Sequence, residues 1–191
     1  MMEYFLLFIG AAVVNNFILY KFLGLCPFIG VSKKTSSALG MGVAVTFVMI
    51  VTTLVTWPLY HMLLDSLGLP FMQYVAFILV ISTLVQLIDM FMQKAMPELH
   101  KAFGIYLPLI TTNCAILGIA LINIIENYTL PEAIFYSLGA GAGFILALLL
   151  MSGIRERLEL TDVPVSMSGV PIALVTGGLM ALAFAGFGGI I

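Results

Sequence analysis

The sequence has little charge. Only 8% of its 191 residues are Asp, Glu, Lys or Arg, and 62% are hydrophobic, whereas a soluble domain carries about 25% charged residues. The net charge of -2 provides no basic surface for nucleic acid, so we expect no nucleic-acid partner. Apolar runs of membrane-spanning length recur six times between short polar connections. The composition excludes an ordinary soluble domain and predicts an all-α integral membrane protein.

The six apolar runs predict six transmembrane helices within a single membrane domain of residues 1–191. We expect them at about residues 4–20, 38–64, 71–92, 102–125, 133–154 and 170–191. The apolar piece 22–31 is too short to cross a bilayer of about 30 Å at about 1.5 Å per residue. The fourth run contains Pro108 and the polar stretch 111–114, which interrupt helical hydrogen bonding. We therefore predict a broken helix at the first and at the fourth span.

The basic residues predict how the chain is oriented in the membrane. All seven fall in the connections after the first, third and fifth spans, and the alternate connections contain none. Because Lys and Arg near span ends are retained in the cytoplasm, we expect both termini on the non-cytoplasmic side. The seven residues are Lys21, Lys33, Lys34, Lys94, Lys101, Arg155 and Arg157.

Six spans divide into two sets of three, at about residues 1–96 and 97–191. Since each set has an odd number of spans, a tandem repeat here must be inverted. The two sets share a C-x-x-x-G pattern that begins at Cys26 and at Cys114, each at the broken segment of its half. Inverted repeats with interrupted helices near the midplane form ion sites in many membrane proteins. The sequence predicts two inverted three-helix repeats.

The sequence has only two cysteines, Cys26 and Cys114. They are too few for a disulfide framework or for a four-thiolate metal site within one chain. As small apolar residues they would simply pack. As ligands they would favour a soft metal, meaning iron–sulfur, zinc or copper(I), and the site would need a partner chain to complete it. The residues alone leave both alternatives open.

Several polar residues lie within the predicted spans. Asp89 is a candidate for an ion path because intramembrane carboxylates are commonly functional, although its place near Lys94 also fits a solvated helix end. Four others could support a cluster or line an ion path, or act only as hydrogen bonds between helices. These four are Asn15, Asn16, Thr112 and Asn113. The sequence has no phosphate loop, nucleophile–base constellation or nucleotide fingerprint, so we predict no catalytic residue.

Motifs along the whole chain resemble the paired membrane subunits of the Rnf and Na⁺-pumping quinone reductase complexes. The runs Asn-Asn-Phe at 15–17 and Cys-Pro-Phe at 26–28 are closer to the A-subunit branch of Rnf than to its quinone reductase counterpart. The other matching runs are 21–25, 31–34, 104–115, 154–158 and 162–164.

The resemblance implies a subunit of a ferredoxin:NAD⁺ oxidoreductase that couples electron flow to Na⁺ or H⁺ transport in the cytoplasmic (inner) membrane of a bacterium or archaeon. It implies pairing with a homologous E subunit of opposite orientation, together with subunits B, C, D and G. In that family two cysteines from each paired subunit are taken to hold one [2Fe–2S] cluster. Cys26 and Cys114 match those ligand positions. NAD⁺ chemistry would then occur on other subunits.

Two alternatives remain beside this electron-relay function. One is a redox-silent ion transporter or channel in which the broken helices bind an ion and the cysteines only pack. The other is a scaffold that assembles a larger complex. The residues alone favour the transporter, because broken helices in inverted repeats are typical of transporters. The resemblance places the electron relay first.

Overall fold

Helices form all of the regular secondary structure in the described part of the computed structural model. The structure describes residues 2–64, 70–95, 107–161, 164 and 167–186. The prediction of an all-α chain is confirmed for these residues. Some predicted features, among them Lys101 and the run 162–163, lie outside them.

Two long helices form the centre of the molecule. They are α3 (Thr35–Leu59), which continues as a π-helical turn η2 (Tyr60–Leu64), and α8 (Leu130–Leu158). Gly141 lets the two backbones approach, because a Cβ atom added there would clash with the side chain of Thr46. A Cβ added at Gly42 of α3 would likewise lie 2.7 Å from the side chain of Ile145. Small residues therefore bring α3 and α8 into close contact, as is typical of helices packed within a membrane.

The first predicted span is a helix that ends early. Helix α1 (Met2–Ile9) continues as the π-helical turn η1 (Gly10–Val14) and packs on α8, where a Cβ added at Gly139 would lie 3.0 Å from the Cα of Phe8. Residues 15–24 are not helical, and a short helix α2 (Leu25–Val31) follows. The predicted break is present, but the prediction that helix extends to residue 20 is wrong.

Asn16 explains why the helix ends there. Its Oδ1 accepts hydrogen bonds from the backbone N–H groups of Ile18 (3.0 Å) and Leu19 (3.3 Å). Its Nδ2 donates to the carbonyl oxygens of Ala12 (3.2 Å) and, on α8, of Gly143 (2.8 Å). Because lipid cannot satisfy backbone polar groups, a break at this depth needs such bonds. Asn16 is fully buried and supplies them.

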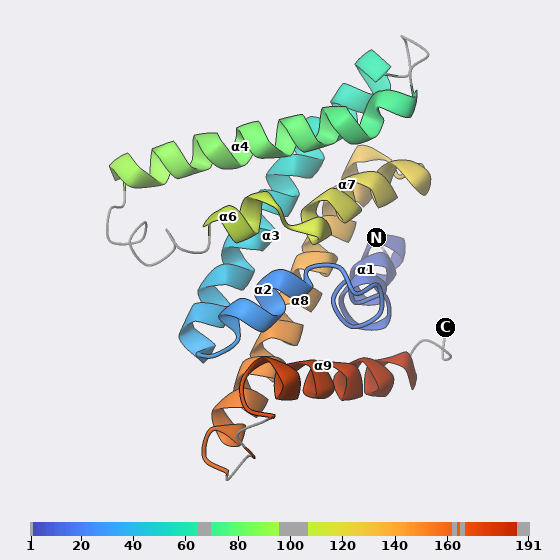
Figure 1. Cartoon of the computed structure of the whole chain (residues 1–191). Coiled ribbons are helices and arrows are strands. Elements are labelled where there is room, and N and C mark those ends of the chain that lie inside the picture. Colours follow the sequence, from blue (N-terminus) through green and yellow to red (C-terminus); the bar gives the residue numbers. More distant parts are fainter. Residues whose placement is uncertain (1, 65–69, 96–106, 162–163, 165–166, 187–191) are drawn as a thin grey trace.

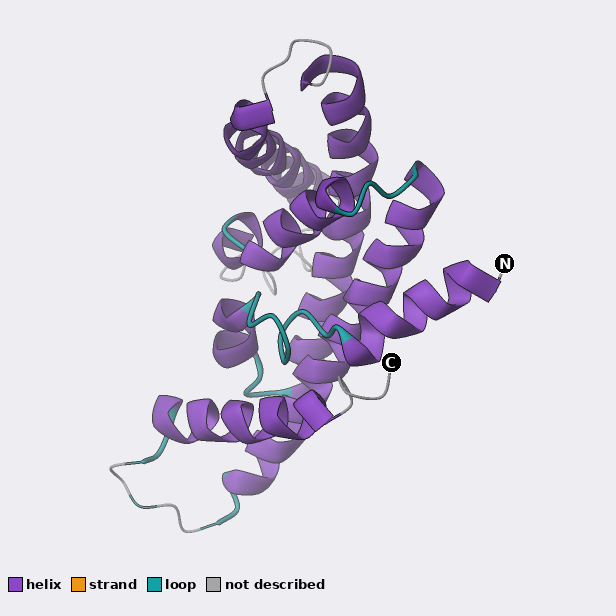
Figure 2. Ribbon diagram, turned by 90° about the vertical axis from the view of Figure 1, so that its right-hand side faces the viewer, coloured by secondary structure: helices purple, strands orange, loops and turns teal. Residues whose placement is uncertain are grey.

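The fourth predicted span is also broken. A short helix α6 (Leu107–Thr111) is separated by two residues from α7 (Cys114–Ile125). The remaining elements are a 3-10 turn η3 (Pro70–Met72), α4 (Gln73–Ala95) and α9 (Val170–Ala185). In both ribbon views α4 lies across one end of the central pair and α9 across the other end (Figures 1 and 2).

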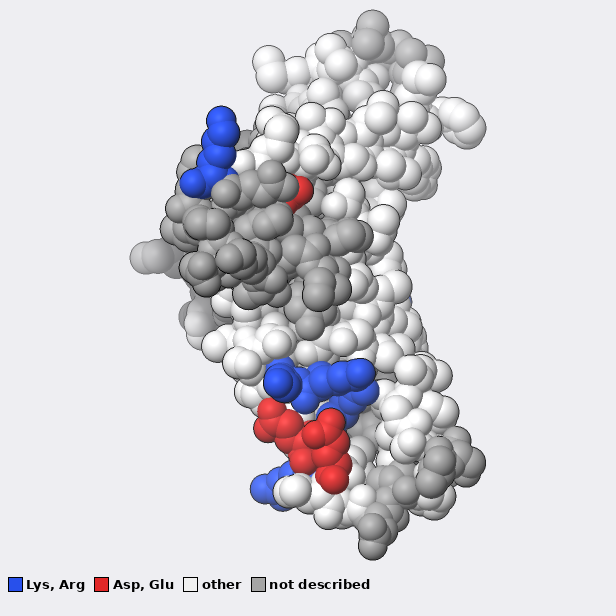
Figure 3. Space-filling model, turned by 60° about the vertical axis from the view of Figure 1, so that its left-hand side comes forward, with Lys and Arg blue, Asp and Glu red and all other residues white. Residues whose placement is uncertain are grey.

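Within the described part of the chain, three helices are long and apolar enough to cross a membrane, at residues 35–64, 73–90 and 130–158. The apolar helical segments 4–14, 109–125 (which includes the second break) and 170–185 are shorter, and large apolar side chains are exposed along α3, α4 and α9. On the face drawn in Figure 3, charged side chains gather in two places and most of the remaining described surface is uncharged. This distribution fits a protein whose surface contacts lipid or other membrane subunits.

Candidate functional site

The two cysteine segments contact each other. The backbone N–H of Gly24, two residues before Cys26, donates a hydrogen bond to Sγ of Cys114 over 2.9 Å. Ninety positions separate these two residues in the sequence. The two helix breaks therefore lie side by side, which places both cysteine-bearing segments in one region of the molecule.

Glycine is the only residue type that fits at position 24. Its φ of 87° lies in the left-handed region, where a side chain is strained. A Cβ atom there would also lie 2.8 Å from the ring of Phe144 and 3.3 Å from the Cβ of Ala115. A glycine is thus required both by the backbone turn and by the close approach of α7 and α8, and the turn directs the Gly24 N–H at Cys114.

Cys114 is the first residue of α7 and is half-buried. Asn113 is the N-cap of this helix, and its Oδ1 accepts a hydrogen bond from the N–H of Ala115 over 3.0 Å. The N-terminus of a helix carries a partial positive charge, which stabilises negative charge close to it. Asn113 is 3% exposed, and its Nδ2 has no hydrogen-bond partner among the described residues. The Cys114 sulfur therefore accepts a hydrogen bond from Gly24 and lies at the N-terminus of α7, and both stabilise negative charge.

Cys26 is the second residue of α2 and is exposed. One arginine of α8 fixes the other end of this short helix. The guanidinium of Arg155 donates to the carbonyl oxygen of Ile29 (2.7 Å) and to Oγ of Ser32 (2.9 Å). Because a positive charge suits the C-terminal end of a helix, this contact holds α2 against α8. It leaves Cys26 at the surface, where another chain can reach it.

This role of Arg155 was not predicted from the sequence. From the sequence alone, Arg155 indicates only the cytoplasmic side of the membrane. In the structure the residue is buried, with 8% of its surface exposed. The signal was present in the helical spacing, because Leu148, Met151, Ser152 and Arg155 form one buried stripe along α8.

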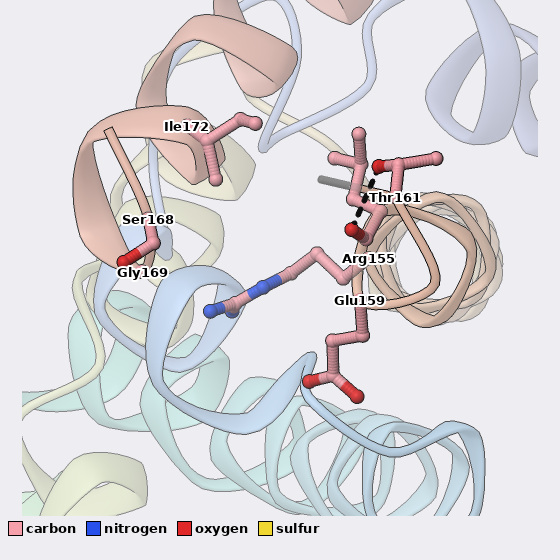
Figure 4. Close-up of a pocket in the computed structure, with 7 residues that line it drawn as sticks. Arg155, Glu159, Thr161, Ser168, Gly169 and Ile172 are labelled. Atoms are coloured by element: carbon pink, nitrogen blue, oxygen red, sulfur yellow. Dashed lines mark hydrogen bonds between the residues drawn. The ribbon is translucent and has the colours of Figure 1, made fainter. Parts of the chain in front are cut away.

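A pocket opens beside the same arginine (Figure 4). It has a volume of about 230 Å³. In Figure 4 the guanidinium of Arg155 and the carboxylate of Glu159 point in different directions, and Oγ1 of Thr161 donates to the carbonyl oxygen of Leu158 over 2.9 Å. None of the predicted site residues lines this pocket, which is formed by Arg155, Leu158, Glu159, Thr161, Ser168, Gly169 and Ile172.

The other predicted site residues lie in different surroundings. Asn15 ends η1 and is exposed, Thr112 is exposed in the second break, and Asp89 is half-buried on α4. Asn16 is committed to the first break by the four hydrogen bonds described above. Within the described residues no group of three or more His, Cys, Asp or Glu side chains is arranged to hold a metal ion. Among the predicted site residues, the described contacts thus bring together the two cysteine segments and Asn113, which caps the helix that begins at Cys114.

Comparison with known proteins identifies the family. A family model described as "Rnf-Nqr subunit, membrane protein" matches residues 4–191. The chain is 56% identical over 181 residues to a protein of Acetobacterium woodii, and the match covers 95% of this chain and 94% of the relative. That relative is named as the A subunit of a Na(+)-translocating ferredoxin:NAD(+) oxidoreductase complex.

Two further relatives are named as A subunits of ion-translocating oxidoreductase complexes. The one from Syntrophotalea carbinolica is 53% identical, with coverage of 97% of this chain and 96% of its own. The one from Cronobacter sakazakii is 52% identical, with coverage of 100% and 99%. Because the family model and these relatives match almost the whole chain, the chain belongs to the Rnf-Nqr family of membrane subunits, among relatives that are named as A subunits.

Proposed function

We propose that this chain is the A subunit of an ion-translocating ferredoxin:NAD⁺ oxidoreductase and that Cys26 and Cys114 supply two of the four ligands of a [2Fe–2S] cluster. The names of the relatives support the complex and its reaction. The contact between Gly24 and Cys114 is the observation that carries the cluster assignment, because it joins the two cysteine segments. The cluster would carry single electrons across the membrane.

The donor atoms fit half of such a cluster. A [2Fe–2S] centre takes four thiolates, and this chain has two cysteines. Cys26 is exposed, so a second chain can approach the site from that side. We assign the other two thiolates to a homologous E subunit of opposite orientation. Subunits B, C, D and G complete the proposed complex.

The surrounding residues suit a bound anionic sulfur. The Gly24 N–H donates to the Cys114 sulfur, and such bonds are among the features that set the reduction potential of iron–sulfur centres. The Nδ2 group of Asn113, the residue before Cys114, is a further donor with no partner among the described residues. Arg155 positions α2 and through it Cys26. These residues bind and orient the ligands and perform no bond-making step themselves.

We further propose that the chain crosses the membrane six times as two inverted repeats, with both termini outside. Each half contains a helix with its cysteine at the first or second position (α7 and α2), a long helix (α8 and α3) and a further helix (α9 and α4). The placement of α4 and α9 at opposite ends of the central pair supports the inversion (Figure 1). Coupling to Na⁺ or H⁺ movement is part of the same proposal, with Asp89, Asn15 and Thr112 as candidates for the ion path.

Electron paramagnetic resonance of the purified complex, together with iron analysis, tests the cluster assignment. We expect Cys26→Ser and Cys114→Ser each to remove one iron–sulfur signal and about two irons while the complex still assembles. Gly30→Ser is the matched control, because Gly30 is an exposed residue of the same α2 helix with open space around it. This control keeps both thiolates and retains the signal.

An unchanged signal and iron content in both cysteine variants would reject the cluster assignment. The two remaining functions, a redox-silent transporter and an assembly scaffold, would then be separated by ion flux. Flux driven by the purified protein in vesicles would favour the transporter, and the lack of such flux would favour the scaffold.

A further inference from the structure

A second polar site lies at the junction of α3, α7 and α8, which pack side by side (Figure 1). Oγ1 of Thr53 on α3 lies 2.7 Å from Oγ of Ser137 on α8. Nδ2 of Asn123 on α7 donates to the same Thr53 oxygen over 3.3 Å. All three side chains are at most 2% exposed. Three helices therefore bring polar atoms together inside the apolar core.

The hydrogen bonds of this cluster use up its hydroxyl protons. Oγ of Ser137 donates its proton to the carbonyl oxygen of Ala133 over 2.7 Å. The Thr53 hydroxyl must then donate in the bond between Thr53 and Ser137. Each hydroxyl oxygen keeps one lone pair, and Oδ1 of Asn123 has no partner among the described residues. The unmet capacity of these three oxygens is for accepting, so the missing partner is a donor or a cation.

A buried polar atom without a partner needs an explanation. Leaving a buried acceptor unsatisfied is costly, and an ordered water or ion is one of the explanations for such an exception in a native protein. Oγ1 of Thr52, the neighbouring residue on α3, is also buried without a partner among the described residues. Two of the three buried unsatisfied atoms in the described part of the chain thus belong to Asn123 and to the residue next to Thr53, and the third belongs to Asn113.

We propose that Thr53, Asn123 and Ser137 bind a dehydrated monovalent metal cation, with Na⁺ as the fitting ion, at this junction. Hard cations take oxygen ligands, and neutral carbonyl and hydroxyl oxygens replace the hydration shell of alkali ions within membranes. None of these three side chains titrates, so the site takes a metal cation and not a proton. The proposal rests on the proposed function in treating the chain as part of an ion-translocating complex.

Helix α7 links this site to the cysteine segments. Cys114 is its first residue and Asn123 its tenth, so the two lie about 14 Å apart along the helix axis at about 1.5 Å per residue. A shift of α7 at one end is therefore transmitted to the other, and occupancy of the cation site and the state of the Cys114 sulfur can influence each other.

Thermal unfolding of the purified complex tests the cation site. A ligand that binds only the folded state raises the unfolding temperature, so NaCl is titrated against choline chloride at constant ionic strength. We expect a Na⁺-specific rise in the wild-type complex. Thr53→Val and Ser137→Ala are each expected to raise the half-saturating Na⁺ concentration at least tenfold.

Thr46→Val is the matched control. Thr46 lies on the same helix, and its hydroxyl donates only to the carbonyl oxygen of Gly42 within α3. This control is expected to respond to Na⁺ as the wild type does. If the Thr53 and Ser137 variants fail to assemble, Asn123→Asp decides, because a carboxylate of the same shape is expected to lower the half-saturating Na⁺ concentration about tenfold, and an unchanged value overturns the proposal.

Two results with assembled complexes overturn the cation site. One is a wild-type complex that responds equally to Na⁺ and choline. The other is a Na⁺ response that Thr53→Val and Ser137→Ala leave unchanged. In that case the three polar side chains would only form hydrogen bonds between helices, together with an ordered water. The iron–sulfur signal of the same samples separates this failure from failure of the proposed function. If the iron–sulfur signal is retained and Na⁺ has no specific effect, only the cation site is rejected. If the wild-type complex has no iron–sulfur signal, only the [2Fe–2S] assignment is rejected.

Discussion

Gly24→Ala is the sharpest test of how the cysteine segments are held together. The left-handed backbone at φ 87° costs a non-glycine residue about 1–2 kcal/mol. The new Cβ would lie 2.8 Å from the ring of Phe144, and overpacking of this kind costs about 1–3 kcal/mol. We expect a total destabilisation of about 3 kcal/mol, which lowers the unfolding temperature by about 6–12 °C for a protein of this size.

The two causes are separable with a double-mutant cycle. Phe144→Leu removes the ring and relieves the steric part of the cost, but leaves the backbone strain of Gly24→Ala. Gly30→Ala is the control, because an added Cβ there meets nothing within 4 Å. Thermal unfolding in detergent measures all four variants. A Gly24→Ala protein as stable as Gly30→Ala, or a cycle with no coupling between residues 24 and 144, would refute the reasoning.

Two further predictions concern Arg155 and Tyr128. Arg155→Met removes two charge-assisted hydrogen bonds to the end of α2, so we expect a loss of about 3 kcal/mol in thermal unfolding and faster maleimide labelling of Cys26; unchanged labelling would contradict the positioning role. Burial, followed by the charges of Glu126 and Glu132, raises the pKa of Tyr128 in the loop between α7 and α8. The stability from the neutral phenol is complete below its ordinary pKa of about 10 and declines as pH rises through the raised folded-state pKa. Stability between pH 9 and 11 should therefore decline less in Tyr128→Phe, and an identical decline would contradict this cause.

The helix breaks were predictable because their signals are local. Gly24 permits a left-handed turn, and Pro108 and the polar run 111–114 interrupt a helix within a few residues. The end of the first helix at Val14 was not predictable in this way. Asn16 ends it by bonding to Gly143, which lies 127 positions away. Local sequence shows that a break is favoured, and long-range contacts decide where it occurs.

The candidate site, too, was predictable from local sequence only in part. Cys26 and Cys114 stand out because they are the only cysteines, but the bond that joins their segments involves the backbone of Gly24, which has no side chain to draw attention to it. The polar cluster at Thr53, Asn123 and Ser137 was missed because single polar residues in apolar helices most often connect helices. Only the three-dimensional arrangement shows that the hydroxyl protons of Thr53 and Ser137 are already donated in hydrogen bonds.

Asn16 and Asn113 look alike in the sequence, and the structure separates their roles. Both use Oδ1 to accept backbone N–H groups at a helix break. In Asn16 the Nδ2 group is also bonded, to Ala12 and Gly143, so every part of this amide serves the fold. A loss of activity in Asn16→Leu would therefore report a damaged break and not an ion path, and we expect that variant to fail in assembly.

Asn113 has an unused hydrogen-bond donor, because its buried Nδ2 has no partner among the described residues. Asn113→Asp removes this donor and keeps an oxygen that caps α7, and Asp is as good an N-cap as Asn. We expect the variant to assemble with near-normal stability and to shift both the potential and the paramagnetic resonance spectrum of the cluster, since donors near the sulfurs tune such centres. Cys114→Ser, which removes a ligand, should instead abolish the signal. An Asn113→Asp complex with an unchanged potential and spectrum would limit Asn113 to capping α7.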